Sequence, residues 1–391
     1  MKKKVGIMTF HSVMNYGSSL QAIAMQNIML DLGFDAELID YRPIAVVEKP
    51  SKVEKLKKLI SIKIWKKHIA YRLFAKRVGF ASARKSREEK YNDFFEKNMR
   101  LSDRCVNREE LLKVAEKYDY LVCGSDQIWN PNYLSGDYSY FLDFCNDVDK
   151  KIAYAPSIAV DKIKDKDKEQ FINCVKDFKY VSVREKGSVE LLKEIAGVSA
   201  QVVLDPTMLV DETTWEQYCD KEKRDEPYIL SYFLGDNVEY QKAVLELKKL
   251  TGYKILNIPH MHLWSAREYY DFGDERLIDV GPSEFLTLIK NAEYICTDSF
   301  HGSVFSILNE KKFFAFKRYS DSSIDSENSR IYTLLDMLEL TDLLVSLPED
   351  VNEKWQQDID YREVKQIIAR EKEPSRKFLL NAFHMEREYE D

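Results

Sequence analysis

The sequence has no uninterrupted apolar stretch of about 18 residues, the length that a membrane-spanning helix requires. Cysteine is also sparse: six residues are scattered through the 391, and no two of them form a C-x-x-C pair. Few, widely spaced cysteines in a chain of this length favour free thiols, so we expect a cytoplasmic setting. The single close histidine pair, His260 and His262, provides too few ligands for a zinc site, and we expect neither a metal nor a cofactor.

The net charge of −7 is distributed unevenly along the chain. Residues 49–90 contain fifteen lysines and arginines against three acids, a local charge of +12, so the remainder carries −19. The wider segment 44–100 reads as a basic helical insertion, with Trp, Ile and Phe among the lysines. Such a segment suits either a solvated helical hairpin or the surface of an anionic membrane. Nucleic acid is a weaker alternative, because no recognised motif accompanies the charge, and we expect no nucleic-acid partner.

Short apolar strands alternate with helical patterns through most of the chain, which predicts parallel sheets with helical crossovers. Residues 5–10 and 36–41 read as strands, and Ser18–Leu32 between them has apolar residues at helical spacing. A chain of this length needs more than one core. We therefore predict an α/β protein with two Rossmann-like doubly wound domains facing each other across a cleft. The expected bounds are 1–209 for the N-terminal domain, 210–360 for the C-terminal domain, and 361–391 for a terminal helix that packs back on the first domain.

The stretch from Tyr294 to Ser306 is the strongest candidate for a functional site. It predicts a strand at 294–296, a polar turn at 297–302 and a helix that opens at Ser303; a strand at 277–280 and a helix over Pro282–Asn291 are expected to precede it. A helix N-terminus at the carboxyl edge of a parallel sheet favours an anion, and His301 would place a proton donor beside it. The alternative is that a polar residue of the turn only caps the helix.

Polar motifs also follow the other predicted strands. Five of them occur in order along the chain: Asn15–Ser18, Gly124–Trp129, Val183–Ser188, Leu204–Thr207 and Thr297–Ser303. Together they resemble the motifs of the polysaccharide pyruvyl transferase family, over roughly residues 5–340. The resemblance implies two Rossmann-like domains arranged as in glycosyltransferases of the B type. It also implies an enzyme that moves the enolpyruvyl unit of phosphoenolpyruvate onto sugar hydroxyls, leaving a cyclic pyruvate ketal and phosphate.

The same resemblance implies roles for individual residues. Arg184 is expected to bind the donor anion, His301 to act as general acid and base at the enolpyruvyl carbons, and Asp126 to take the proton of the attacking hydroxyl. The alternative for Asp126 is turn capping. Arg330 is expected to be a second anion partner, with a surface salt bridge as the alternative, and Arg318 is a weaker anion partner. The expected substrate contacts are Asn15, Tyr16, Gly17, Ser18, Ser125, Gln127, Ser299, Gly302, Ser303 and Arg330.

The expected acceptor is a sugar in a surface or capsular polysaccharide precursor, carried on polyprenyl diphosphate. Residues 49–90 would then hold the enzyme at the inner face of the plasma membrane, as a peripheral protein. Two other functions stay open at this point. One is a glycosyltransferase of the same architecture that uses a nucleotide sugar, and the other is a glycan-binding relative that kept the fold without turnover.

Overall fold

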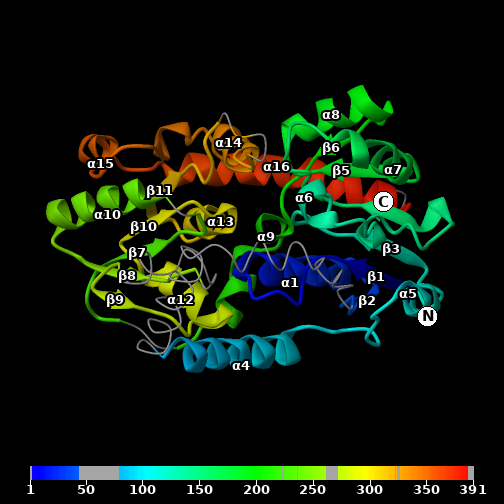
Figure 1. Ribbon diagram of the computed structural model, residues 1–391, viewed down its shortest axis with the longest axis horizontal. Helices are drawn as coiled ribbons and strands as arrows, with labels where there is room; N and C mark the ends of the chain where they lie inside the picture. Colours follow the sequence, from blue (N-terminus) through cyan, green and yellow to red (C-terminus); the bar gives the residue numbers. More distant parts are fainter. Residues whose placement is uncertain are drawn as a thin grey trace, which may run out of the picture.

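Two six-stranded parallel sheets organise the molecule, one in each half of the chain (Figure 1). They confirm the predicted α/β class with two parallel-sheet domains, while the predicted domain bounds stay predictions. Most of the basic segment, residues 44–78, lies outside the part of the chain that the structure describes. The described residues of this computed structural model are 2–43, 79–221, 224–235, 237–260, 272–321, 323 and 326–385.

The first sheet has the strand order β2-β1-β3-β4-β5-β6. Its third strand in the chain reads Tyr-Leu-Val-Cys and is buried at all four positions, as expected for an inner strand covered by helices on both faces. The strands are β1 (Lys4–Met8), β2 (Asp35–Leu38), β3 (Tyr120–Cys123), β4 (Lys151–Ala153), β5 (Tyr180–Val183) and β6 (Gln201–Val202). The helices of this half are α1 (Tyr16–Asp31), α4 (Phe80–Asn98), α5 (Arg108–Ala115), α6 (Pro131–Leu134), α7 (Asp165–Lys176), α8 (Lys186–Ala196) and α9 (Pro206–Leu209).

The second sheet has the order β12-β11-β10-β7-β8-β9. Its strand β10 reads Tyr-Ile-Cys-Thr, is also buried throughout, and lies between β11 and β7. The strands are β7 (Tyr228–Tyr232), β8 (Lys254–Asn257), β9 (Glu275–Arg276), β10 (Tyr294–Thr297), β11 (Lys312–Phe316) and β12 (Leu344–Val345). The helices are α10 (Val238–Thr251), α12 (Pro282–Asn291), α13 (Phe300–Leu308), α14 (Ser329–Met337), α15 (Pro348–Lys354) and α16 (Tyr361–Ala382), so the bounds predicted for α12 are confirmed.

The strand predicted at 277–280 is wrong. The edge strand β9 ends at Arg276, and only the amide of Leu277 still bonds to the neighbouring strand, through the Asn257 carbonyl at 2.8 Å. The chain then leaves the sheet. The carbonyl of Val280 accepts a hydrogen bond from the hydroxyl of Tyr16 at 2.9 Å, so a contact with the first domain replaces the expected ladder.

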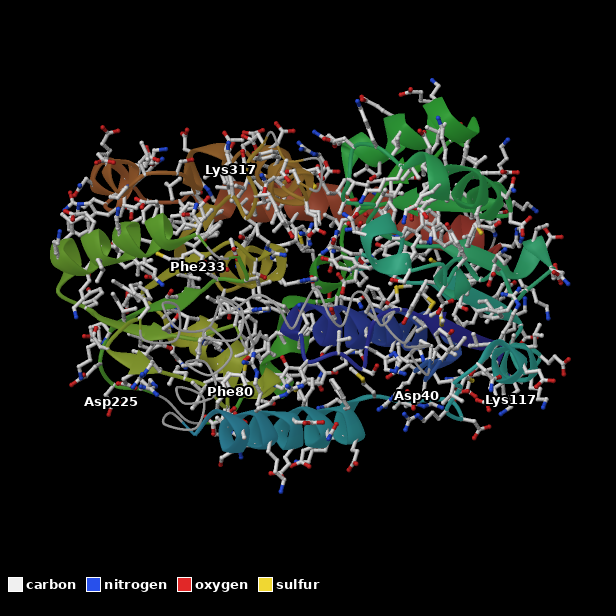
Figure 2. All side chains as sticks on the ribbon, in the orientation of Figure 1. Asp40, Phe80, Lys117, Asp225, Phe233 and Lys317 are labelled. Atoms are coloured by element: carbon white, nitrogen blue, oxygen red, sulfur yellow. The ribbon has the colours of Figure 1, made fainter. Side chains whose placement is uncertain are left out.

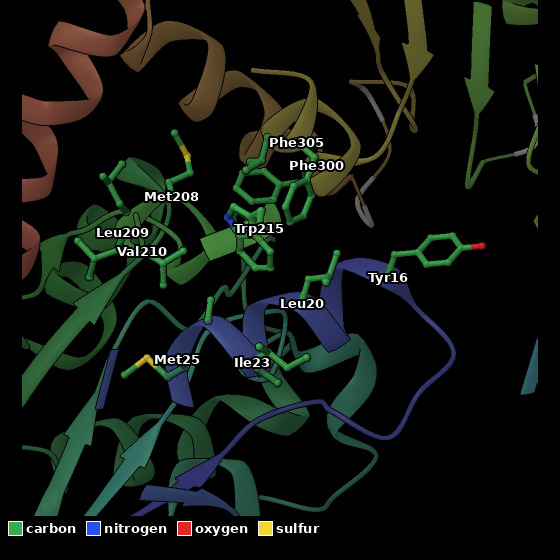
Figure 3. Packing of buried hydrophobic residues seen from close by; sticks show 14 of the residues in the cluster. Tyr16, Leu20, Ile23, Met25, Met208, Leu209, Val210, Trp215, Phe300 and Phe305 are labelled. Carbon is green, nitrogen blue, oxygen red and sulfur yellow. The ribbon is translucent and has the colours of Figure 1, made fainter. Parts of the chain in front are cut away.

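Helix α1 lies between the two domains. Nearly all its residues from Tyr16 to Met29 are buried, because the second domain covers the side that faces away from its own sheet. Figure 3 shows Leu20 and Ile23 of this helix near Trp215 and Phe300, and all four belong to one hydrophobic cluster. The core therefore runs through both halves of the molecule.

The C-terminal helix α16 crosses from the second domain to the first, as the red ribbon in Figure 1 shows. The hydroxyl of Ser375 accepts a hydrogen bond from the Leu204 amide at 3.0 Å. Just after the helix, Phe383 packs its ring 4.5 Å from Phe34 and 5.0 Å from Tyr120, measured between centroids. Among the helices of the described ranges, none has the length and apolar character needed to cross a membrane.

We predict that Phe383→Ala lowers the free energy of unfolding by about 3–5 kcal/mol, because Phe383 is 2% exposed and truncation leaves a cavity between α16 and the first sheet. Urea unfolding of the full chain measures the change. Leu347→Ala is the control, since this side chain is 56% exposed and should shift the midpoint little. Equal midpoints for the two variants would show that α16 does not stabilise the first domain.

Candidate functional site

The carboxylate of Asp205 lies where the carboxyl ends of both sheets meet. Asp205 follows β6 and is 2% exposed. Its Oδ2 accepts hydrogen bonds from Ser125 Oγ and from Arg184 Nη1, both at 2.8 Å, and lies 3.6 Å from His301 Nε2. Its Oδ1 accepts from the amide and hydroxyl of Thr207, at 3.0 and 2.6 Å. Asp205 thus joins two predicted site residues from the first domain to one from the second.

Burial alone would raise the pKa of the Asp205 carboxyl. Electrostatic interaction with His301, together with Arg184 and Thr207, outweighs burial and holds this pKa well below its ordinary value. Asp205 is therefore ionised at neutral pH. It provides a fixed negative charge against which the imidazole and the guanidinium are placed.

Arg184 directly follows β5 and is almost completely buried. Its Nε donates to Glu185 at 3.2 Å, and its guanidinium lies 4.1 Å from the centre of the Phe300 ring, in a contact that crosses the domain interface. Burial lowers the pKa of Arg184, but the charges of Glu185 and Asp205 outweigh burial and raise it. Its Nη2 is buried without a hydrogen-bond partner. One charged donor of Arg184 is therefore available to an anion.

His301 lies in the first turn of α13, and its Nε2 likewise has no hydrogen-bond partner. On its other side the ring faces Gly17 of the first domain. A Cβ atom built on Gly17 would lie 2.0 Å from His301 Nδ1, far inside van der Waals contact. Position 17 must therefore be glycine for the imidazole to occupy this place between the domains.

The helix predicted to open at Ser303 begins at Phe300 instead. Ser299 is its N-cap and accepts a hydrogen bond from the Gly302 amide at 3.2 Å. The Ser303 amide is already part of the helix and donates to the Ser299 carbonyl at 2.9 Å. Gly302 is packed so closely that a Cβ would lie 2.5 Å from Thr297 Oγ1. The positive end of the helix dipole therefore lies at residues 299–301, beside the imidazole.

The polar turns of the first domain bond mainly to each other. Asn15 caps α1 by accepting from the Ser18 amide at 3.2 Å. The Ser18 hydroxyl donates to Asp126, whose other carboxylate oxygen accepts from the Gln127 amide at 2.9 Å. Asp126 also has a φ of 74°, a left-handed conformation that costs free energy in a residue with a side chain. Both carboxylate oxygens of Asp126 are thus engaged in hydrogen bonds. Its role as a base stays a prediction.

A second polar cluster forms around Glu327, which is 4% exposed. Its Oε1 accepts from Asn130 at 2.9 Å and from Tyr133 at 3.1 Å, both in the first domain, and its Oε2 accepts from Arg330 Nη2 at 2.8 Å. With its amide oriented to satisfy these neighbours, Gln127 accepts from Arg330 Nη1 at 2.7 Å. Arg330 is therefore in a buried ion pair, rather than in the surface salt bridge of the alternative interpretation.

Tyr16 and Arg318 lie differently from the other predicted residues. Tyr16 is fully buried, with its ring stacked on Phe285 at 4.1 Å between centroids and its hydroxyl bonded to the second domain. In this structure it joins the domains. Arg318 lies near Asp298 and Glu327, with Nη2 3.4 Å from the Asp298 carbonyl, and its buried Nε faces Asp298 Oδ2 at 3.9 Å without a hydrogen bond.

Three residues of the site were missed from the sequence: Asp205, Glu327 and Phe300. Asp205 lies in one of the five motifs, Leu204–Thr207, directly after a predicted strand, and that position is the available signal. Glu327 lies in a loop rich in Ser and Asp, where nothing distinguishes it from its neighbours. Phe300 reads as a helix core residue, because contact with an arginine of the other domain leaves no trace in local spacing.

The fold is similar to solved structures of sugar-nucleotide enzymes. UDP-GlcNAc 2-epimerase from Neisseria meningitidis, bound to UDP-GlcNAc, superimposes with a TM-score of 0.51 at 11% identity, covering 97% of this chain and 100% of that chain. The S. aureus MnaA–UDP structure gives 0.53 at 11% identity, with 99% and 98% covered. Comparison with curated proteins finds no match. These low identities show the fold alone, a glycosyltransferase-B-like pair of domains.

The match to a protein family is more specific. Residues 15–320 match the family described as Polysaccharide pyruvyl transferase. This span includes Asp205, Arg184 and His301, and it covers most of the 391 residues. The chain therefore belongs to the polysaccharide pyruvyl transferase family, a family of transferase enzymes that modify polysaccharides.

Proposed function

We propose that the protein transfers the enolpyruvyl unit of phosphoenolpyruvate to two hydroxyls of a sugar, forming a cyclic pyruvate ketal and releasing phosphate. The acceptor in this proposal is a surface or capsular polysaccharide precursor carried on polyprenyl diphosphate. One observation carries the proposal. Arg184 from the first domain and His301 from the second lie against the same oxygen of Asp205, and each keeps a buried nitrogen without a hydrogen-bond partner.

These two nitrogens suit the chemistry of this donor. Phosphoenolpyruvate carries a phosphate and a carboxylate, which a guanidinium N–H and the positive end of α13 can bind without a metal. A proton delivered to C3 of the enol makes C2 electrophilic, and an imidazole is a suitable proton carrier near neutral pH. One sugar hydroxyl adds to C2 and loses its proton, and the C2–O bond to phosphate breaks. The second hydroxyl then adds to C2 and loses its proton to the departing phosphate, which closes the ketal ring.

A nucleotide-sugar transferase is the second candidate, since the similar structures named above were solved with UDP or UDP-GlcNAc. Thermal-shift measurements with phosphoenolpyruvate and with UDP sugars separate the two. Stabilisation by phosphoenolpyruvate alone, followed by a mass increase of one pyruvate on a lipid-linked acceptor, supports the proposal. Stabilisation by UDP sugars alone would overturn it. Binding of glycan with no turnover of either donor would identify a non-catalytic relative.

We predict that His301→Gln lowers the rate of phosphate release about 10²–10⁴-fold, the usual contribution of a positioned acid or base. The amide fills a similar space but carries no titratable proton. Phosphate release from phosphoenolpyruvate in the presence of acceptor measures the effect. His384→Gln is the control, because His384 is exposed at the end of α16. Equal rates in the two variants would remove His301 from the mechanism.

We predict that Gly17→Ala reduces turnover by about 10²-fold or more, because a small displacement of a catalytic group has an effect of this size. The new methyl group would overlap the His301 ring, which must then leave its present position beside Asp205. Gly187→Ala is the matched control, since no atom lies within 4 Å of a Cβ built there. Circular dichroism checks folding. A folded Gly17→Ala enzyme with unchanged turnover would show that His301 need not stay between the domains.

The proposed membrane contact rests on composition, since residues 44–78 lie outside the described residues. We predict that replacing Lys52, Lys55, Lys57, Lys58, Lys66 and Lys67 with glutamine weakens binding to anionic liposomes strongly, at about 1 kcal/mol per lysine near the surface. Co-sedimentation with phosphatidylglycerol vesicles measures binding, and neutral vesicles are the control. Unchanged sedimentation would leave a solvated segment as the better interpretation.

A further inference from the structure

Arg87 is a buried arginine on the inner face of α4, the helix that runs beneath α12 and α1 in Figure 1. Figure 2 labels Phe80, where this helix begins below the second domain. Arg87 is 5% exposed, and its guanidinium lies 4.9 Å from the centre of the Tyr16 ring. Its Nε and Nη1 are buried without hydrogen-bond partners. Two nitrogens of this charged side chain therefore lie buried at the domain interface without a close hydrogen-bond acceptor.

The other buried arginines of the interface each lie near a carboxylate, whereas no ion pair joins Arg87 to a carboxylate within the described ranges. Two carboxylates at the start of α12 and just before it, Glu284 and Asp279, are bonded to Lys90 at 2.5 and 3.4 Å. Aromatic rings surround the guanidinium instead. A desolvated cation without a counter-charge is costly, so its retention calls for a function.

The surroundings of Arg87 contain further polar groups. The hydroxyl of Tyr91, one turn along α4, is also buried and interacts with Arg87 and Tyr16, and its ring stacks on Tyr16 at 5.5 Å. Interaction with the hydroxyls of Tyr16, Tyr91 and Tyr232 outweighs the effect of burial and raises the pKa of Arg87. The side chain therefore stays charged. The Nε and Nη1 groups of Arg87, with the phenol of Tyr91 beside them, form a donor set for an oxyanion.

Arg87 also lies next to the candidate centre. The tyrosine that it covers, Tyr16, precedes Gly17, which contacts His301. Tyr232 ends strand β7, and its carbonyl accepts a hydrogen bond from Thr297 at the end of β10. A group bound at Arg87 would therefore lie near the carboxyl ends of β7 and β10. Strand β10 leads into the helix that carries His301.

We propose that Arg87, with the Tyr91 hydroxyl, forms a second oxyanion subsite that binds a phosphate or diphosphate group. The subsite is separate from the Arg184 donor that would receive phosphoenolpyruvate. Its existence does not depend on the transferase chemistry. Its assignment to the diphosphate of a lipid-linked acceptor rests on the proposed function, and on the position of α4 at the end of the basic segment.

The test compares Arg87→Met with Arg84→Met, whose side chain is exposed on the same helix. Inorganic pyrophosphate is the probe, and the thermal transition of the full chain is the readout. Methionine fills the apolar space and removes an unpaired buried charge, so the unliganded protein should not lose stability. We expect Arg87→Met to weaken pyrophosphate binding about tenfold or more, while Arg84→Met binds as the unchanged protein does.

If both methionine variants bind pyrophosphate as the unchanged protein does, the subsite is overturned. If both variants lose binding equally, the loss indicates surface charge alone, and the subsite is overturned as well. If Arg87→Met does not fold, Arg87→Lys replaces it. Lysine keeps the cation but not the planar fork, so pyrophosphate should bind more weakly than to the unchanged protein but still measurably. Binding to Arg87→Lys equal to that of the unchanged protein would also overturn the subsite.

Two further probes distinguish the source of the oxyanion, measured in the His301→Gln background so that turnover plays no part. A short-chain prenyl diphosphate represents the acceptor, and phosphoenolpyruvate represents the donor. Loss of the prenyl diphosphate shift alone on Arg87→Met supports the acceptor assignment. Loss of the phosphoenolpyruvate shift alone would overturn it. Because pyrophosphate binding needs no turnover, failure of the transferase proposal would leave this measurement unaffected.

Discussion

The carboxylate of Asp205 is the group on which the geometry of the interface depends. Thr207 binds Oδ1 and so fixes the carboxylate within its own loop, which leaves Oδ2 facing Ser125, Arg184 and His301. A carboxylate has about four acceptor positions, and here nearly all are used. Since the group is buried and ionised, removing its positive partners would leave an uncompensated charge. The two domains are therefore held together at this point by electrostatics as well as by apolar packing.

Three consecutive residues at the start of α1 set how the domains fit. Tyr16 stacks on Phe285 and bonds to Val280, which ties α1 to the second domain. Gly17 leaves room for the His301 ring, and Ser18 bonds to Asp126 in the neighbouring loop of the first domain. Because these roles are adjacent in the chain, a shift of the domains would change the contacts of Tyr16 and Gly17 together. The placement of His301 is thus coupled to the packing of the whole interface.

Much of the fold could be predicted from the sequence, because strand and helix periodicity and turn residues are local signals. The bounds of α12 follow from Pro282 at its start and the apolar spacing behind it. The start of α13 was misjudged, since Gly302 is a poor helix former and its place in the helix depends on close packing against Thr297. Contacts between the domains were less accessible. Arg184 and His301 could each be predicted as site residues from the sequence. That the Asp205 carboxylate joins them could not, because this contact depends on tertiary structure.

The interface contains many acids, which would seem to oppose binding of an anionic donor. Two of them accept hydrogen bonds from backbone amides: Asp298 accepts from Leu234 and Gly235 at 2.7 and 2.8 Å, and Asp126 accepts from the amide that follows it. Arg184 meets its own carboxylates through Nε and Nη1, which leaves Nη2 outside those pairs. Because a buried guanidinium binds through directed N–H groups, the free donor, and not the net charge of the region, determines where an anion can bind.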